Sequence, residues 1–515
     1  MRYTGSDKED GKTAGLYFTK GLIVIVFVFI IVYAISRSVF VTFAQYSFLE
    51  KSFAVVFLLS ELFIMFHAIG YFSGMYRIGR GIFAAQPPGP AASAQPPVAI
   101  LVPARHEPRD VLEGTLACIY NLDYPEKRIY LLDDSSEERY KEEAEELAGR
   151  YKCALFRRQE RHGAKAGIIN DCMKGLDEKY IAIFDVDQNP MPSFLSRLMP
   201  IMEADPKLAF VQTPQFYSNT DASRIADSAN TQQAVFYEYV CEGKSSGGAM
   251  ICCGTNVLMR REALASVGGF DETSVTEDFS TSFRLQTNGW RTLYCNHVNT
   301  FGMGPENLSA YLSQQNRWAM GNVSILGRIL RALFTRPFAM KPLQWFEYFI
   351  TSSYYLAGWA YIFLVLCPVI YILFGIPSFF MHPVVYTLTF VPYLILSVAI
   401  FYSTMGIRRY TPKSAFLAQA LSFVTIPVYI RAGISGLLGV RGKFQVTKKG
   451  VSPRIPYLRL WPQLLLLALN YIALLWGINK CIYERTTAIM LNVAWIAYHC
   501  ILFSSVFYFN EEKGG

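Results

Sequence analysis

The sequence predicts an α/β domain with a mainly parallel β-sheet, inserted between membrane-spanning α-helices. Composition is the first reason: of the 515 residues, 52% are hydrophobic and only 17% are charged, whereas an ordinary soluble domain has about 25% charged residues. The second reason is the distribution of apolar residues. They form long runs at both ends of the chain, while residues 98–330 are polar enough that no window there could span a bilayer.

The apolar runs predict six membrane spans. Residues 21–36 and 52–73 each approach the roughly 20 residues needed to cross a bilayer. The first is interpreted as an uncleaved anchor, because no small-residue cleavage site follows it. Four more spans are expected near residues 353–375, 383–404, 458–479 and 487–508.

Residues 413–440 are apolar too, but Pro427 interrupts them and basic residues flank them. They predict an interfacial helix, with a further span as the alternative.

Six spans place both termini and the polar domain on one side of the membrane. Basic residues in 406–412 and 441–454 favour the cytosol for that side, and the plasma membrane is the expected location. The predicted organisation is residues 1–83 as a tail with two transmembrane helices, 84–97 as a Pro/Ala-rich linker, 98–330 as the α/β domain, and 331–515 as interfacial helices with four transmembrane helices.

The charge and the cysteines exclude some function classes. The net charge of +8 fits either the usual basic excess of cytosolic loops or attraction for anionic substrates such as nucleotide diphosphates. No nucleic-acid reader motif is present, so no nucleic-acid partner is expected. The 10 cysteines form no CxxC pair and the 6 histidines show no metal-ligand spacing, which favours free thiols over disulfides or a zinc site.

Within the polar domain, short β-rich runs alternate with helical patterns such as residues 137–150. In a parallel sheet, ligands bind beyond the carboxyl ends of the strands. Two of the strands end in acidic pairs, Asp133-Asp134 and Asp185-Val186-Asp187. The four predicted strands are residues 98–104, 129–134, 153–158 and 180–187.

Four motifs carry candidate chemistry, and each also has a purely structural explanation. Asp185 and Asp187 can hold Mg²⁺ or Mn²⁺ with a diphosphate, or they are solvated turn acids. Lys165, in the motif HGAKAG, can meet a phosphate at a helix N-terminus, or it is a surface lysine. In Thr276-Glu277-Asp278, Asp278 can be a general base, or Thr276 caps a helix whose first turn is acidic.

The fourth motif is Gln314-Gln315-Asn316-Arg317-Trp318. On a helix, Gln314 and Arg317 share one face, where Arg317 can bind a pyrophosphate and Trp318 can stack on a sugar. The alternative is a membrane-edge helix with an aromatic anchor.

In their order and spacing over residues 98–330, the segments LDD, HGAKAG, DVD, ICCGTNVLMRR, GGFDETSVTED and QQNRW resemble the processive family 2 glycosyltransferases. Cellulose, chitin and hyaluronan synthases share this pattern. Residues 444–449, FQVTKK, fit FxVTxK and resemble the gating loop of cellulose synthases, which extends the resemblance to about residues 50–510. The resemblance implies a GT-A (Rossmann-like) cytosolic glycosyltransferase domain inserted in an α-helical transmembrane domain.

The same resemblance implies roles for individual residues. Glu107, Asp133 and Asp134 would bind the nucleotide sugar, with Lys165 and Asp185 at its diphosphate. Asp185 and Asp187 would hold a divalent cation, Mg²⁺ or Mn²⁺. Asp278 would be the catalytic base within the triplet that includes Thr276 and Glu277. Pyrophosphate and acceptor contacts would come from Gln314, Arg317 and Trp318, and the gating loop would close through Phe444, Val446 and Thr447.

The implied activity is an inverting, processive polymerisation of a UDP-sugar, expected to be UDP-glucose, into a β-linked, cellulose-like glucan secreted through the protein's own channel. Its partners would be the UDP-sugar, the growing polysaccharide, the lipid bilayer and accessory export subunits. Alternatives are a 1,3 or mixed 1,3/1,4 glucan, another hexose polymer, single-sugar transfer to a lipid, and an inactive transferase acting as a membrane scaffold.

Three departures from the bacterial cellulose synthase pattern bear on these expectations. Arg105 stands where an aromatic residue is more usual, which weakens the inference of a uracil base. Ser135-Ser136 replaces a pair of glycines. No segment after the last apolar run resembles a cyclic-di-GMP-binding domain, so direct activation by that signal is not expected.

Overall fold

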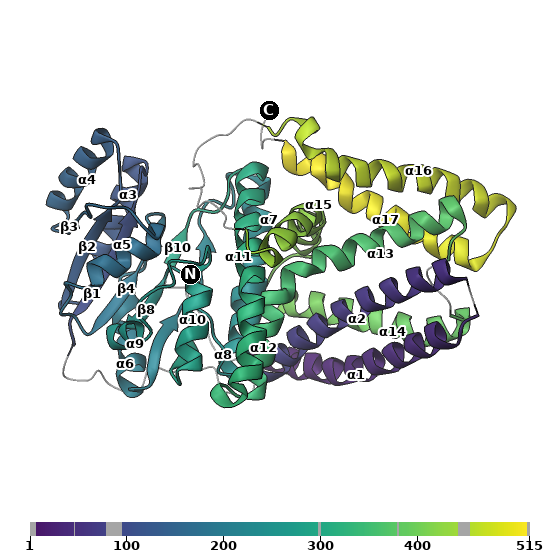
Figure 1. Ribbon diagram of the computed structural model, residues 1–515, viewed down its shortest axis with the longest axis horizontal. Coiled ribbons are helices and arrows are strands. Elements are labelled where there is room, and N and C mark those ends of the chain that lie inside the picture. Colours follow the sequence, from purple (N-terminus) through teal and green to yellow (C-terminus); the bar gives the residue numbers. More distant parts are fainter. Residues whose placement is uncertain are drawn as a thin grey trace.

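The computed structural model describes residues 7–45, 47–78, 95–296, 300–377, 381–440 and 454–511. Figure 1 shows two parts arranged along the longest axis of the molecule. The β-sheets and their helices form one end, and a bundle of long helices forms the other. Helices α11 (Leu308–Thr335) and α12 (Pro342–Ser353) stand upright between the two parts. The polar domain and the apolar helices are therefore separate layers, as the sequence predicts.

The main sheet has seven strands in the order β3-β2-β1-β4-β8-β6-β9. Strands β3, β2, β1 and β4 pair in parallel, whereas β8 runs antiparallel to both β4 and β6, so the sheet is mixed. The four predicted strands are present, but β3 and β4 are only about half as long as the predicted runs 153–158 and 180–187. The strands are β1 (Val98–Ala104), β2 (Lys127–Asp133), β3 (Ala154–Phe156), β4 (Tyr180–Ile183), β6 (Leu208–Gln212), β8 (Val257–Arg260) and β9 (Arg291–Tyr294).

Two apolar cores sandwich this sheet. Strand β1 is almost wholly buried because its residues VAILVPA are apolar on both faces, as expected for a strand covered by helices on each side. One core lies under α3 (Arg109–Tyr120), α4 (Glu138–Arg150) and α6 (Phe194–Ala204). The other lies under α5 (Ala164–Met173), α9 (Arg261–Ser266) and α10 (Glu277–Thr287).

The sequence did not predict a second, small sheet. It has the order β5-β10-β7 and stands beside the carboxyl end of β4. The segment that follows it leads toward the long helices through a π-helical turn. These elements are β5 (Gln188–Pro190), β7 (Phe216–Tyr217), β10 (Thr300–Gly302), α7 (Arg224–Val235), the π-helix η1 (Phe236–Cys241) and α8 (Glu242–Ser246).

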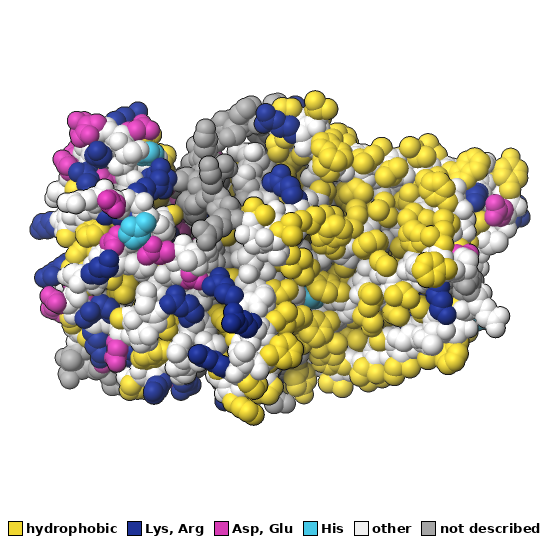
Figure 2. All heavy atoms as spheres, viewed as in Figure 1, with side chains coloured by type: hydrophobic (Ala, Val, Ile, Leu, Met, Phe, Trp, Pro, Cys, Tyr) yellow, Lys and Arg dark blue, Asp and Glu magenta, His cyan; other side chains and the backbone are white. Residues whose placement is uncertain are grey.

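Among the described residues, seven helical stretches are long and apolar enough to cross a membrane. They include all six predicted spans, and Figure 2 shows hydrophobic side chains covering this part while charged side chains cover the other. Hairpins α1–α2 and α16–α17 both turn at the end farthest from the sheet (Figure 1). The helices are α1 (Asp7–Phe43), α2 (Phe48–Arg77), α13 (Ala357–Phe374), α14 (Pro383–Ile407), α15 (Pro412–Leu437), α16 (Trp461–Tyr483) and α17 (Thr487–Asn510).

Helix α15 is the segment for which an interfacial position is predicted. Its length and composition would also allow a span. In Figure 1, however, it is seen nearly end-on and lies across the direction of the six other long helices, next to α11 and α7. This arrangement favours the interfacial interpretation over the seventh span.

Buried ion pairs join the two parts. Lys244 of α8 donates to Glu347 of α12 at 3.0 Å, and both side chains are almost fully buried. Arg77, at the end of α2, reaches the same carboxylate at 2.5 Å. Because a buried charge is tolerated only when it is paired, these three residues fix the α/β domain against the first membrane hairpin.

Candidate active site

A pocket opens at the carboxyl ends of β1, β2 and β4, the edge at which a parallel sheet binds its ligands. Its empty volume is about 1130 Å³ with the open mouth included. It collects residues from segments that lie far apart in the sequence. Ten of the predicted site residues line it: Glu107, Asp134, Lys165, Asp185, Asp187, Thr276, Glu277, Asp278, Arg317 and Trp318.

Lys165 and Asp185 form the floor of the pocket. The Nζ atom of Lys165 donates to Oδ1 of Asp185 at 2.5 Å and to the carbonyl oxygen of Gly254 at 2.8 Å. Burial lowers the pKa of Lys165, but the charges of Asp185, Glu277 and Asp278 outweigh it and raise the pKa above its usual value. The lysine therefore stays charged, and the Asp185 carboxylate, 40% exposed, stays open to a ligand.

Asp185 and Asp187 fit a hard divalent cation only as part of a shared site. Both line the pocket, and the part of the chain that the structure describes contains no group of three or more His, Cys, Asp or Glu residues able to hold a metal ion. Mg²⁺ commonly binds through one or two carboxylates, with substrate phosphates and water completing its shell. Two carboxylates at the mouth of a strand match that pattern, and they leave the other ligand positions to a diphosphate.

Glu277 and Asp278 occupy the first turn of α10 and line the pocket. Burial raises the pKa of Glu277 to about 7, and the neighbouring Asp278 charge adds to the shift. Burial also raises the pKa of Asp278, while the Phe279 amide and the charges of Lys165 and Arg317 partly offset it. A carboxylate whose pKa lies closer to neutrality is a better proton acceptor at cytosolic pH.

Thr276 does not act as the helix cap that its sequence position suggests. It is the residue before α10, but its side chain makes no capping hydrogen bond. Instead it packs on α11: a Cβ atom built at Gly321 would lie 2.3 Å from Thr276 Cγ2. The close approach of this loop to α11 therefore depends on a glycine in the helix.

Helix α11 brings the QQNRW motif to the pocket. Arg317 and Trp318 line it. Gln314 is not among the lining residues and hydrogen-bonds the Tyr217 hydroxyl of the small sheet. The neighbouring Gln315 points the other way, where its Oε1 accepts from Tyr429 of α15 at 2.9 Å. Helix α11 thus touches the pocket with one face and α15 with the other.

The remaining predicted residues lie in different places. Asp133 is buried outside the pocket lining, and its carboxylate accepts from Arg157 Nε at 2.7 Å. Asp134 does line the pocket, but both of its oxygens accept from Arg158 and one also from Arg161, each at 2.9 Å. Phe444, Val446 and Thr447 of the predicted gating loop lie outside the described residues.

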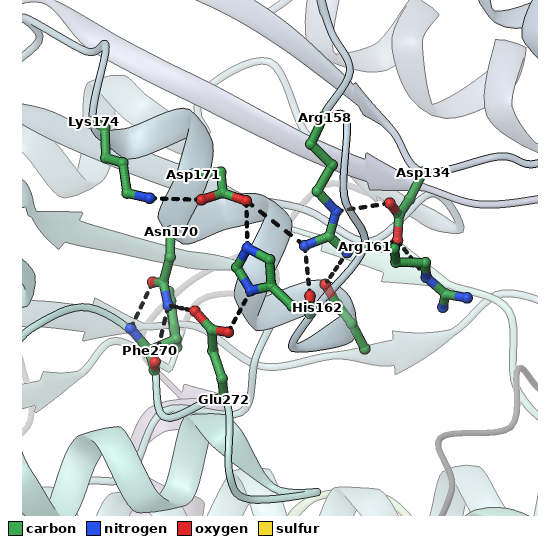
Figure 3. A network of polar contacts seen from close by, with 10 residues as sticks. Asp134, Arg158, Arg161, His162, Asn170, Asp171, Lys174, Phe270 and Glu272 are labelled. Atoms are coloured by element: carbon green, nitrogen blue, oxygen red, sulfur yellow. Dashed lines mark hydrogen bonds and ion pairs between the residues drawn. The ribbon is translucent and has the colours of Figure 1, made fainter.

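Sequence reasoning missed the polar network beside the pocket that Figure 3 shows. It links Asp134 to Arg158 and Arg161, and then continues through His162 to Asp171 and Glu272. The basic run 157–162, RRQERH, lies between two strands that end in acids, and this charge pattern was the available signal.

Comparison with known proteins agrees with this geometry. A family model described as "Glycosyltransferase like family 2" matches residues 96–321, and one described as "Cellulose synthase" matches residues 265–489. The chain is thus similar to family 2 glycosyltransferases in its α/β domain and to cellulose synthases from residue 265 into the membrane helices. The second match runs from the segment before Asp278 through the membrane helices, so it joins the pocket and the bundle in one family pattern.

The similar curated proteins are cellulose synthases. A cellulose synthase catalytic subunit of Pseudomonas fluorescens is 29% identical over 427 residues, which cover 80% of this chain and 56% of that protein. A cellulose synthase 1 catalytic subunit of Komagataeibacter xylinus is 27% identical over 481 residues, covering 89% and 62%. The chain therefore spans less than two thirds of the length of these relatives.

A solved structure confirms the GT-A fold. A mannosyltransferase from Pyrobaculum calidifontis, determined with GDP-Man and Mn²⁺, aligns with a TM-score of 0.54 at 18% identity, covering 75% of this chain and 99% of that one. At this identity the likeness concerns the fold alone.

Proposed function

We propose that this protein is an inverting, processive glycosyltransferase that polymerises a UDP-sugar, in the first place UDP-glucose, into a β-linked glucan. The observation that carries the proposal is the pocket itself. It brings the Lys165–Asp185 pair, Asp187, the Glu277–Asp278 pair and the Arg317–Trp318 face around one space. Anion binding, proton acceptance and sugar stacking are thus available at a single site, which is what transfer from a nucleotide sugar requires.

The donor diphosphate would lie between Lys165 and Arg317. Two fixed cations at the pocket wall suit the two phosphates, and Asp185 and Asp187 would hold a divalent cation against them. That cation, Mg²⁺ or Mn²⁺, would neutralise the charge developing on the departing nucleotide diphosphate. Lys165 would carry its positive charge when it binds the phosphates. The neighbouring carboxylates raise the pKa of Lys165 by more than burial lowers it.

Asp278 would accept the proton of the attacking acceptor hydroxyl. As the new glycosidic bond forms on the face opposite the diphosphate, the donor's anomeric bond breaks and the electron pair leaves on the diphosphate. One base is sufficient for such a single displacement, which explains why inversion is proposed. Arg317 lies close enough to stabilise the Asp278 carboxylate, so it can connect the base with the leaving group.

A processive enzyme must retain its product between additions. Helix α11 carries Trp318 on its pocket face and packs against α15 on its other face, so an elongating chain stacked on the tryptophan would leave toward the membrane helices. We propose that these helices enclose the export path and that the α/β domain faces the cytosol, where UDP-sugars are made. The partners would then be the donor, the polysaccharide, the bilayer and accessory export subunits.

The test is UDP release by the purified protein in nanodiscs. UDP-glucose, UDP-GlcNAc, UDP-glucuronate and GDP-mannose are offered separately with Mg²⁺ or Mn²⁺. The proposal expects release with UDP-glucose, loss of release after chelation, and a fall of at least ~100-fold in Asp278→Asn, the range that general-base removal gives. Release with only another donor would move the enzyme out of the glucan branch. Equal rates in the Asp278→Asn variant would contradict the assignment of the base.

A further inference from the structure

Outside the pocket, a set of polar contacts joins the segment that precedes Lys165 to the segment that precedes Asp278. The first segment, residues 157–164, leads into α5 and Lys165. The second, residues 268–276, leads into α10 and Asp278. Figure 3 shows the His162 ring between Glu272 of the second segment and Asp171 of α5. None of the roles proposed above uses this histidine.

His162 bridges two carboxylates. Its Nδ1 lies 2.7 Å from Oε2 of Glu272 in the second segment. Its Nε2 lies 2.8 Å from Oδ2 of Asp171 on α5. Nδ1 hydrogen-bonds the Glu272 carboxylate, and Nε2 lies at ion-pair distance from Asp171. Two carboxylates this close to one imidazole favour its protonated form, the imidazolium. The bridge is therefore an ion pair at both ends, and the positive charge holds it together.

The backbones on both sides are shaped for this contact. Asn170 donates to the Phe270 carbonyl oxygen at 3.0 Å and to Glu272 Oε1 at 2.8 Å, and the Phe270 amide donates back to Asn170 at 2.8 Å. Two glycines allow the approach. A Cβ atom at Gly163 would lie 2.3 Å from the Glu272 side chain, and one at Gly269 would lie 2.4 Å from Asn170. The close approach of the two backbones and the hydrogen bonds of Asn170 distinguish this contact from an isolated surface ion pair.

We propose that His162 is a positioning residue: in its charged form it latches the Lys165 segment to the Asp278 segment and keeps the two sides of the pocket in register. It lies three residues before Lys165, and Glu272 lies six residues before Asp278. Only the expected effect of the latch on kinetics rests on the proposed function, since the latch itself is a property of the fold.

The charge of His162 makes the latch sensitive to pH. The hydrogen bond that His162 donates to Glu272 raises the pKa of His162 above its usual value. Burial opposes this shift, and the charges of Glu272 and Asp171 add to it. The other groups facing this cluster are Arg158 and Lys174, which both pair with Asp171. The pKa of His162 is higher in the folded protein than in the unfolded chain. The latch is therefore fully formed below about pH 6.5, the ordinary pKa of histidine. It is lost as the pH rises through the raised pKa of the folded protein.

Hydrogen exchange on the full chain in nanodiscs tests the latch without relying on catalysis. We expect peptides covering 157–164 and 268–276 to be protected at pH 6 and to lose protection by pH 8.5, after correction for the intrinsic pH dependence of exchange. His162→Ala should leave both peptides unprotected at both pH values. His162→Arg, which keeps a cation with several donors, should protect them at both.

Lys174→Ala is the matched control, because Lys174 pairs with Asp171 but does not reach Glu272; it should exchange like the wild type. In the donor assay, His162→Ala should lower kcat/KM about tenfold, since small displacements of catalytic groups have effects of this size or larger. Arginine should restore it and flatten its fall at high pH. Unchanged exchange and an unchanged pH profile in His162→Ala would overturn the latch, whereas absence of turnover in the wild type would contradict only the proposed function.

Discussion

Glu277 and Asp278 give the pocket a pair of acids whose protonation should control turnover. The proposed base must be ionised to accept a proton, so the rate should rise with pH as the pair loses its proton. Burial raises the pKa of Asp278, and that of Glu277 to about 7. We expect kcat/KM for the donor to show an acid limb near pH 7, well above the ordinary carboxylate range of about 4.

Glu277→Gln separates the two acids. It removes a neighbouring negative charge that makes ionisation harder, so the acid limb should move to lower pH while turnover persists. A limb that stays near 7 in this variant would assign the titration to another group. The His162 latch weakens as the pH rises, so it would produce the fall of kcat/KM at alkaline pH.

At the level of single residues, the sequence predicted the residues that line the pocket better than the polar contacts around it. Lys165, Asp185 and Asp278 follow strand ends or open helices, so the topology alone directs them to one edge. Asp133 differs because the first acid after β2 turns inward to Arg157. The His162–Glu272 bridge joins residues 110 positions apart, and no local pattern specifies such a contact.

Helix α11 depends on one glycine, Gly321, for its contact with the loop that carries Thr276. In Gly321→Ala, the new Cβ would meet Thr276 at 2.3 Å, which forces the loop or the helix to move. Such overpacking typically costs about 1–3 kcal/mol, and here it would also displace Asp278 from Arg317. We expect a lower melting temperature and at least tenfold slower donor turnover.

Gly327→Ala on the same helix is the matched control. A Cβ atom at this position has nothing within 4 Å, and replacing a helical glycine by alanine gains about 1 kcal/mol of helix stability. The variant should melt at the same or a higher temperature and keep its activity. Equal losses of melting temperature and donor turnover in both variants would contradict a specific role for the contact between Gly321 and Thr276.

The elements themselves were predicted where the pattern is local and strong. The all-apolar run 98–104 is β1 residue for residue, and the helical pattern 137–150 begins one residue later as α4. Strands β6, β8 and β9 were not predicted. They are short, β8 runs antiparallel, and their partners lie far along the chain, so their identity depends on tertiary pairing.

For the whole molecule, the membrane account makes a prediction about insertion. Leu364 lies in the middle of α13, within the candidate span Pro342–Phe374. Leu364→Arg should cost about 2.5–3.5 kcal/mol of insertion free energy if that side chain faces lipid. The expected result is a lower yield of membrane-integrated protein, measured by carbonate extraction.

Phe338→Arg provides the comparison, because Phe338 is 98% exposed in the turn that precedes α12 and lies outside the span. Its integration should match that of the wild type. Normal integration of Leu364→Arg would count against placing α13 across the bilayer. The sequence predicted the spans from hydropathy alone, but the crosswise position of α15 comes from its packing against α11 and α7, which hydropathy does not encode.

The central claim is that one chain both polymerises a sugar and exports the polymer. The most direct measurement uses proteoliposomes with the α/β domain outward, radiolabelled UDP-glucose in the medium, and size separation of the labelled product before and after vesicle lysis. The account predicts long labelled chains that resist added glucanase until the vesicles are opened, and none with Asp278→Asn. Label found only as single sugars on lipid, or only as polymer accessible from outside, would contradict it.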